Sequence, residues 1–175
     1  MSAVTILTGR VLSFATTPFD GAPGAAARLD EAVALQDGRI LARGAAGELR
    51  AAHPQAVRHA YGDKVICAGF VDPHVHFPQT AMIASWGKRL IDWLNSYTFP
   101  EEMKFADPAY AAEIAARYLD LTAAEGTTTM CSFCTIHPGS VDALFTEAQR
   151  RGQRVVAGKT CMDRNAPEGL RDSAQ

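Results

Sequence analysis

Apolar and polar residues alternate in short runs along the first third of the chain. Residues 4–12 and residues 32–43 both have the two-residue period of β-strands. Asp37 and Gly38 interrupt the second run, where a tight hairpin turn requires residues of this kind. The pattern therefore predicts a small β-rich unit over residues 1–67.

From Val65 the pattern changes. Residues 65–71 are continuously apolar, which predicts a strand buried on both faces. Helical and strand-like segments then alternate to the end of the sequence. The expected elements are a helix over 80–96, a helix from Asp107 to Gly126, a strand over 127–136, a helix over 140–151 and a strand over 154–162.

Strands that alternate with helices are typical of a parallel sheet or barrel. We therefore predict an α/β fold: about the first three βα units of an incomplete (β/α)₈ TIM-like barrel over residues 68–175, preceded by the small N-terminal β unit. A closed barrel of this kind needs eight strands and typically about 250 residues. We accordingly expect the 175 residues to be the N-terminal part of a longer enzyme.

The composition is that of an ordinary globular protein, with 47% hydrophobic and 21% charged residues. A formal net charge of −2 provides no general attraction to nucleic acid or to anionic lipid. No apolar run approaches the roughly 20 residues of a membrane span, and the first residues lack the features of a secretory signal. We expect a cytoplasmic protein without nucleic-acid or membrane partners.

Two histidines follow the apolar run, one residue apart. Residues i and i+2 of a strand point to the same side, so His74 and His76 present two imidazoles on one face. Imidazole nitrogens suit zinc, although iron, cobalt or nickel would accept the same ligands. The motif alone leaves two interpretations open: half of a metal site, or two histidines that are merely hydrogen-bonded at a strand end.

Other candidates for a site are weaker. Cys131 and Cys134 form a C-x-x-C motif, but residues i and i+3 of a strand face opposite sides, which favours core packing over metal binding. His137 follows the same strand and precedes Pro138, as solvated loop histidines often do. We therefore leave these three residues out of the predicted site.

Several motifs in order carry a resemblance to a known family. The stretch AGFVDPHVH, residues 68–76, resembles the PGFVD-H-H motif with which the amidohydrolase superfamily begins its barrel. More specific are PQT at 78–80, DWLNSYTFPEE at 92–102, EGTTT at 125–129, TIHPGSVDALF at 135–145 and AGKTCMDRNAPEGLRD at 157–172. Together these motifs are similar to those of the guanine deaminases within that superfamily.

This resemblance implies a zinc-dependent enzyme, one ion per subunit, that converts guanine to xanthine and ammonia. His74 and His76 match the first two metal ligands, Gln79 matches a residue that hydrogen-bonds the purine, and His76, Phe77 and Pro78 would line the same wall of the pocket. The family's other metal ligands, its proton-shuttling glutamate and an arginine that holds the base would all lie beyond Gln175. No catalytic residue is therefore expected within this chain.

The resemblance also implies a homodimer for the full-length enzyme. Two alternatives remain open: a related amidohydrolase that deaminates another amino-substituted ring, such as 8-oxoguanine or a triazine, and a truncated chain without catalytic activity.

Overall fold

The structure is a computed structural model that describes residues 2–17, 19–87 and 89–172. The chain divides into two compact units, Met1–Ala68 and Gly69–Gln175.

The first unit is built on a four-stranded sheet in the order β3-β2-β1-β4. Strand β1 pairs antiparallel with β2 and parallel with β4, and β2 pairs antiparallel with β3. The elements are β1 (Thr5–Phe14), α1 (Pro23–Ala26), β2 (Ala27–Gln36), β3 (Arg39–Gly44), α2 (Ala46–Ala52) and β4 (Val57–Ile66). Asp37 and Gly38 have φ angles of 49° and 73°, which confirms the predicted hairpin turn.

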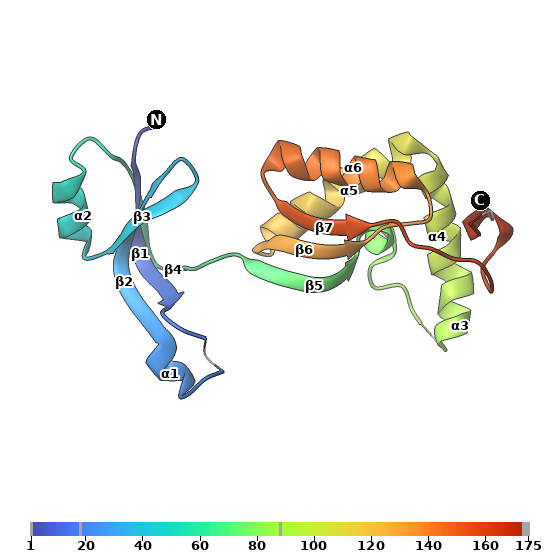
Figure 1. The fold of residues 1–175 in the computed structure, drawn as a ribbon, viewed down its shortest axis with the longest axis horizontal. Coiled ribbons are helices and arrows are strands. Elements are labelled where there is room, and N and C mark those ends of the chain that lie inside the picture. The colour runs from blue at the N-terminus through green and yellow to red at the C-terminus, as the bar shows by residue number, and fades with distance from the viewer. Residues whose placement is uncertain (1, 18, 88, 173–175) are drawn as a thin grey trace. The chain divides into compact units, whose positions relative to one another are not determined.

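The second unit contains a three-stranded parallel sheet in the order β5-β6-β7 (Figure 1). Its strands are β5 (Phe70–His76), β6 (Thr127–Phe133) and β7 (Arg154–Gly158). Helix α5 (Pro108–Ala124) precedes β6, and α6 (Pro138–Arg151) connects β6 to β7. The predicted alternation of helices with parallel strands is therefore confirmed.

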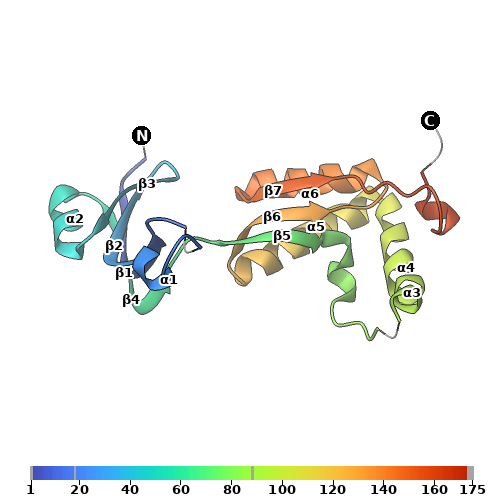
Figure 2. The same cartoon turned by 60° about the horizontal axis from the view of Figure 1, so that its bottom comes forward.

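Helices α5 and α6 cover one face of this sheet (Figure 2). Met130 and Ser132 of β6 are buried on that face, where Met130 joins a core with Ile114, Leu119 and Leu144 of the two helices. The intervening residues of β6 point the other way, so Phe133 is 41% exposed. The sheet therefore has a helix-covered face and a face that the described residues leave open, called here the open face.

Helix α5 has the boundaries that its sequence predicts. The Asp107 carboxylate accepts a hydrogen bond of 2.9 Å from the backbone N–H of Ala109, and Pro108 occupies the first turn. Gly126 follows the helix with a φ of 83°, a conformation that favours glycine. In the described part of the chain, no helix is both long enough and apolar enough to cross a membrane.

The apolar run 65–71 does not form the single buried strand that we predicted. Strand β4 ends at Ile66 and pairs with β1, whereas β5 begins at Phe70 and pairs with β6. The side chains of Val65, Phe70 and Val71 are more than half exposed. The run is shared by the ends of two strands in different units, and an unbroken apolar pattern contains no signal for where one strand stops.

The predicted helix over 80–96 is also wrong in its first half. A 3₁₀ helix, η1 (Phe77–Met82), follows β5, and Ala84 has a φ of 62°, which is incompatible with a continuing helix. The helical region begins at Leu90 and extends past residue 96. It consists of α3 (Leu90–Trp93), the π-helical η2 (Leu94–Thr98), α4 (Phe99–Met103) and the 3₁₀ helix η3 (Lys104–Ala106).

Candidate metal and purine site

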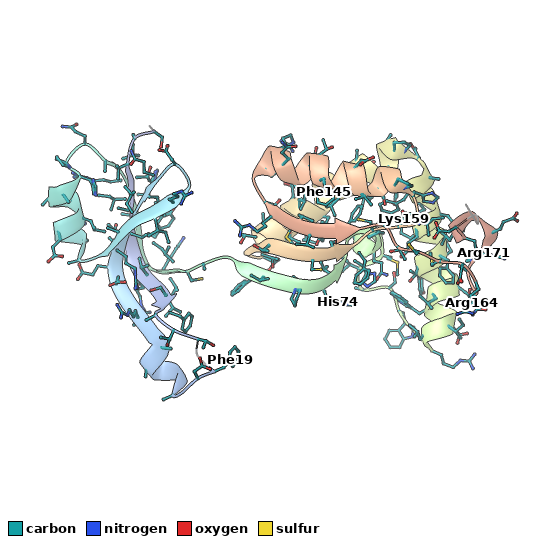
Figure 3. The ribbon with its side chains drawn as sticks, in the orientation of Figure 1. Phe19, His74, Phe145, Lys159, Arg164 and Arg171 are labelled. Atoms are coloured by element: carbon teal, nitrogen blue, oxygen red, sulfur yellow. The ribbon has the colours of Figure 1, made fainter. Side chains whose placement is uncertain are left out.

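Strand β5 places His74 (Figure 3) and, two residues on, His76 at the carboxyl end of the parallel sheet. Its pairing with β6 shifts between Asp72 and Val75, so that one extra residue is accommodated beside Pro73. Proline cannot donate a hydrogen bond to a neighbouring strand, which explains a bulge at this point. The Asp72 carboxylate accepts a 3.0 Å hydrogen bond from the backbone N–H of His74 and so stabilises the bulge.

The two imidazole rings lie together with Phe133 of β6. The centroids of His74 and His76 are 5.4 Å apart, with an interplanar angle of 61°. The ring of Phe133 stacks on His76 at 4.8 Å and 15°, and its centroid is 5.1 Å from that of His74. Phe133 therefore supports both imidazoles from the neighbouring strand, a contact that our sequence analysis missed.

The pKa of His76 is lowered from its ordinary value. Burial disfavours the charged imidazolium, and the nearby His74 adds a smaller effect in the same direction. A lowered pKa keeps the imidazole neutral at physiological pH, and the neutral form is the one that can ligate a metal.

Gln79 lies close to the histidines because η1 turns the chain directly after β5. The Thr80 hydroxyl donates a 2.7 Å hydrogen bond to the carbonyl oxygen of Phe77 and holds this turn. His74, His76, Gln79, Thr80 and Trp93 line part of a pocket of about 430 Å³. The structure thus brings together three of the five residues predicted for the site.

The other two predicted residues are placed differently. Phe77 and Pro78 are buried and are not among the residues that line this pocket. The Phe77 ring packs in the core, 5.4 Å from the ring of Phe105 and 5.9 Å from that of Tyr118. Phe77 is therefore a core residue, and the predicted role of Phe77 and Pro78 as a wall of the substrate pocket stays a prediction.

Glu102 on α4 is a further polar residue that our sequence analysis did not single out. Its side chain is only 7% exposed, and α4 packs against η1, the element that carries Gln79. Burial raises the pKa of Glu102 to about 7, although the nearby Gln79 amide works in the opposite direction. The sequence signal was present in the FPEE motif, but nothing in the motif tells which glutamate faces Gln79.

The weaker candidates stay outside this site. Cys131 of β6 is exposed, so the prediction of core packing is wrong for this residue, whereas Cys134, directly after β6, packs in the core. His137 is not the solvated loop residue that we expected. It precedes α6, and its Nε2 atom is buried without a hydrogen-bond partner among the described residues.

The donor set at the end of β5 fits part of a zinc site. Two imidazoles on one face are suitable ligands, and the neutral state of His76 is the form that binds metal. Within the described ranges, no three His, Cys, Asp or Glu side chains lie close enough together to hold an ion. The residues in hand therefore offer two ligands, and a four-coordinate site requires others.

Comparison with known proteins agrees with this arrangement. The sequence model of the Amidohydrolase family matches residues 65–175, which is more than half of the chain. The chain belongs to the amidohydrolase family. A second model, an imidazolonepropionase-like composite domain from bacteria, matches residues 32–56 of this amidohydrolase chain.

Among curated relatives, guanine deaminase from Escherichia coli K12 is 46% identical over 123 residues, which are 70% of this chain and 28% of that protein. A probable guanine deaminase from Deinococcus radiodurans is 44% identical over 117 residues, 67% of this chain and 27% of that protein. The amidohydrolase chain thus spans less than a third of the length of these two relatives.

Solved structures show the same relationship. Guanine deaminase from Bradyrhizobium japonicum matches with a TM-score of 0.92 and 37% identity, over 98% of this chain and 38% of that one. Guanine deaminase from C. acetobutylicum, solved with guanine bound in its active site, matches with a TM-score of 0.81 and 28% identity, over 97% of this chain and 39% of that one. The fold of the amidohydrolase chain is therefore that of the corresponding part of these enzymes.

Proposed function

We propose that the protein carrying this chain is a zinc-dependent guanine deaminase, which hydrolyses guanine to xanthine and ammonia. The observation that supports this most directly is the grouping of His74, His76 and Gln79 around one pocket at the carboxyl end of β5. The activity is suggested by relatives up to 46% identical that bear this name.

In this proposal, the imidazoles of His74 and His76 are two of the ligands of one zinc ion, and the amide of Gln79 binds an edge of the purine. When bound, the metal supplies Lewis-acid activation of water. Phe133 keeps the His76 ring in a fixed orientation, because stacked rings resist rotation. His76, together with Phe77 and Pro78 behind it, forms the wall against which the purine lies.

The rest of the site is proposed to come from strands that complete a (β/α)₈ barrel, of which β5, β6 and β7 would be the first three. The barrel interior would then correspond to the open face of the sheet. That face carries His76 and Phe133, so completion of the barrel would enclose both rings.

Turnover of guanine by the full-length, zinc-loaded protein tests the proposal. We expect xanthine and ammonia in equal amounts, and we expect slower turnover of 8-oxoguanine and of an amino-substituted triazine. Faster turnover of either alternative would reassign the substrate, and absence of ammonia from all three would reject the proposed deaminase activity. Sedimentation of the same preparation tests the predicted homodimer, while the cytoplasmic location stays a prediction from the sequence.

A further inference from the structure

The chain leaves strand β5 directly after His76, and the backbone N–H of the next residue, Phe77, has an unusual partner. In a regular parallel sheet, such an N–H binds a carbonyl oxygen of the neighbouring strand. Here it donates a 3.3 Å hydrogen bond to the side-chain hydroxyl of Ser132 on β6. Phe77 is fully buried, so bulk water cannot replace this hydroxyl.

The same hydroxyl also contacts the residue that supports the His76 ring. Ser132 is paired with Val75 in the sheet, and Phe133 is paired with His76. The Ser132 Oγ atom donates a longer hydrogen bond, of 3.4 Å, to the carbonyl oxygen of Phe133, whose ring stacks on His76. One buried oxygen atom thus links the backbone that follows His76 to the backbone that carries its aromatic support.

The carbonyl group of Phe77 is also bound by a hydroxyl. It accepts the 2.7 Å hydrogen bond from Thr80 within η1. The Phe77 ring is held in the core by contacts with two other aromatic rings. Because Phe77 lies between His76 and Gln79 in the sequence, the bonds to its backbone determine the direction in which the chain carries these two pocket residues.

We propose that Ser132 is a positioning residue for the metal ligand His76. Its hydroxyl fixes the point at which β5 ends and η1 begins, and so holds the imidazole in the orientation that binds zinc. This inference rests on the proposed function, because it takes His76 to be a ligand. Ser132 is 4% exposed and lies on the helix-covered face, so it acts through the backbone and not by contact with metal or substrate.

The test compares Ser132→Ala with Ser140→Ala in the full-length protein. Ser140 is fully buried, and its hydroxyl accepts a 3.2 Å hydrogen bond from the N–H of Thr135 and donates one of 2.8 Å to the carbonyl oxygen of His137. It makes the same kind of contact, but at the end of β6 rather than of β5. We expect the zinc dissociation constant, measured by competition with a chelator, to rise about tenfold in Ser132→Ala and to stay within about twofold of the wild type in Ser140→Ala.

Two histidine variants test whether Ser132 acts through His76. In the His76→Asn background, Ser132→Ala should leave the remaining zinc affinity unchanged, because the imidazole that Ser132 positions is absent. In the His74→Asn background, Ser132→Ala should still weaken zinc binding about tenfold. Equal effects of Ser132→Ala in the two backgrounds would overturn the positioning role.

Urea unfolding of the metal-free variants separates positioning from a general loss of stability. Both serine variants lose buried hydrogen bonds and should be destabilised, so a loss of zinc affinity confined to Ser132→Ala cannot come from stability alone. If both variants lose zinc affinity equally, or if neither does, the role is overturned.

Ser132→Cys serves in place of Ser132→Ala if the alanine variant does not fold. Cysteine nearly keeps the size of the side chain, but sulfur is a weak hydrogen-bond acceptor, so zinc binding should weaken at least about threefold. Wild-type zinc affinity in Ser132→Cys would then overturn the role.

The proposed function can fail separately from this inference. A wild-type protein that binds zinc but forms no xanthine rejects the deaminase activity, and the zinc measurements still decide the role of Ser132. A wild-type protein that binds no zinc overturns both proposals.

Discussion

At the scale of single residues, His74 and His76 are the side chains on which metal binding should depend. Replacing either by asparagine in the full-length protein removes an imidazole ligand while retaining a polar side chain. We expect zinc affinity to fall by at least about 10- to 100-fold, since loss of a residue that merely supports a ligand already costs that much. Metal content after dialysis, measured by atomic emission, checks this expectation.

His59 provides the matched control. It lies on β4 in the first unit with an exposed side chain, and His59→Asn should leave zinc content unchanged. Equal zinc content in His74→Asn and His59→Asn would show that the pair at the end of β5 does not bind the metal.

Glu102 should make stability depend on pH in a specific direction. Its pKa is about 7 in the folded chain and about 4.5 when exposed, so the folded state binds this proton more tightly. The stabilisation from the protonated carboxyl is present below about pH 4.5 and is lost as the pH rises through about 7. Glu102→Gln carries no such proton. As the pH rises through this range, its free energy of unfolding should therefore increase relative to that of the wild type, by at most about 3 kcal/mol.

Urea unfolding of the wild type and Glu102→Gln at pH 5 and pH 8 measures this difference. If the free energies of unfolding of the two proteins differ by the same amount at pH 5 and at pH 8, the raised pKa of Glu102 is contradicted.

The sequence identified His74, His76 and Gln79, because a two-residue period and a nearby motif place them without reference to the rest of the fold. It could not identify Phe133 or Glu102 as their neighbours. Phe133 lies beside His76 through strand pairing, and Glu102 comes near Gln79 through the packing of α4 on η1. Both contacts join residues more than 20 positions apart, for which a single sequence carries no local signal.

At the scale of elements, the sequence predicted the helix start and the hairpin turn that are determined by residues adjacent in the chain. The cap at Asp107 and the turn at Asp37-Gly38 are examples, since both involve bonds or dihedral angles of adjacent residues. The π-helical turn η2 was not predictable in the same way. It directly precedes α4, where Pro100 lacks the backbone N–H that a regular α-helix would use for a hydrogen bond. Whether a helix responds to the missing bond with a π-helical turn depends on the packing around it.

Gly69 is the residue that allows β5 to begin so close to β6. A Cβ atom at this position would lie 2.1 Å from Thr128 Oγ1 and 2.4 Å from its Cγ2, which no real side chain tolerates. Gly69→Ala should therefore lower the free energy of unfolding of the full-length protein by about 1–3 kcal/mol, the usual cost of overpacking. It should also lower zinc affinity, because β5 carries both histidines.

Gly139 of α6 is the matched control for this substitution. A Cβ atom there would meet no heavy atom within 4 Å, so Gly139→Ala should be neutral or stabilising by up to about 1 kcal/mol. Chemical denaturation measures both variants. Adding Thr128→Ala to Gly69→Ala should recover part of the loss, and equal stability of the two alanine variants would contradict the close approach at Gly69.

At the scale of the whole molecule, the described residues leave one face of a parallel sheet without a covering layer. Parallel sheets are ordinarily buried on both faces. Helices α5 and α6 cover the face with Met130 and Ser132, whereas Val156 of β7, which pairs with Cys131 of β6, is 62% exposed on the open face. The sequence of these 175 residues cannot specify what lies against the open face.

The open face predicts how the 175-residue chain behaves when it is produced alone. Exposed apolar side chains on a sheet with unpaired edges at β5 and β7 favour self-association. We expect oligomers in sedimentation velocity across a concentration series, and we expect Val156→Asp to weaken association at least about tenfold, because a carboxylate buried without a partner is costly.

Phe145→Asp is the matched control, since Phe145 is exposed on α6 rather than on the open face, and its oligomers should persist (Figure 3). A wild-type chain that stays monomeric throughout the series, or a Phe145→Asp variant that dissociates as readily as Val156→Asp, would show that the open face does not drive association.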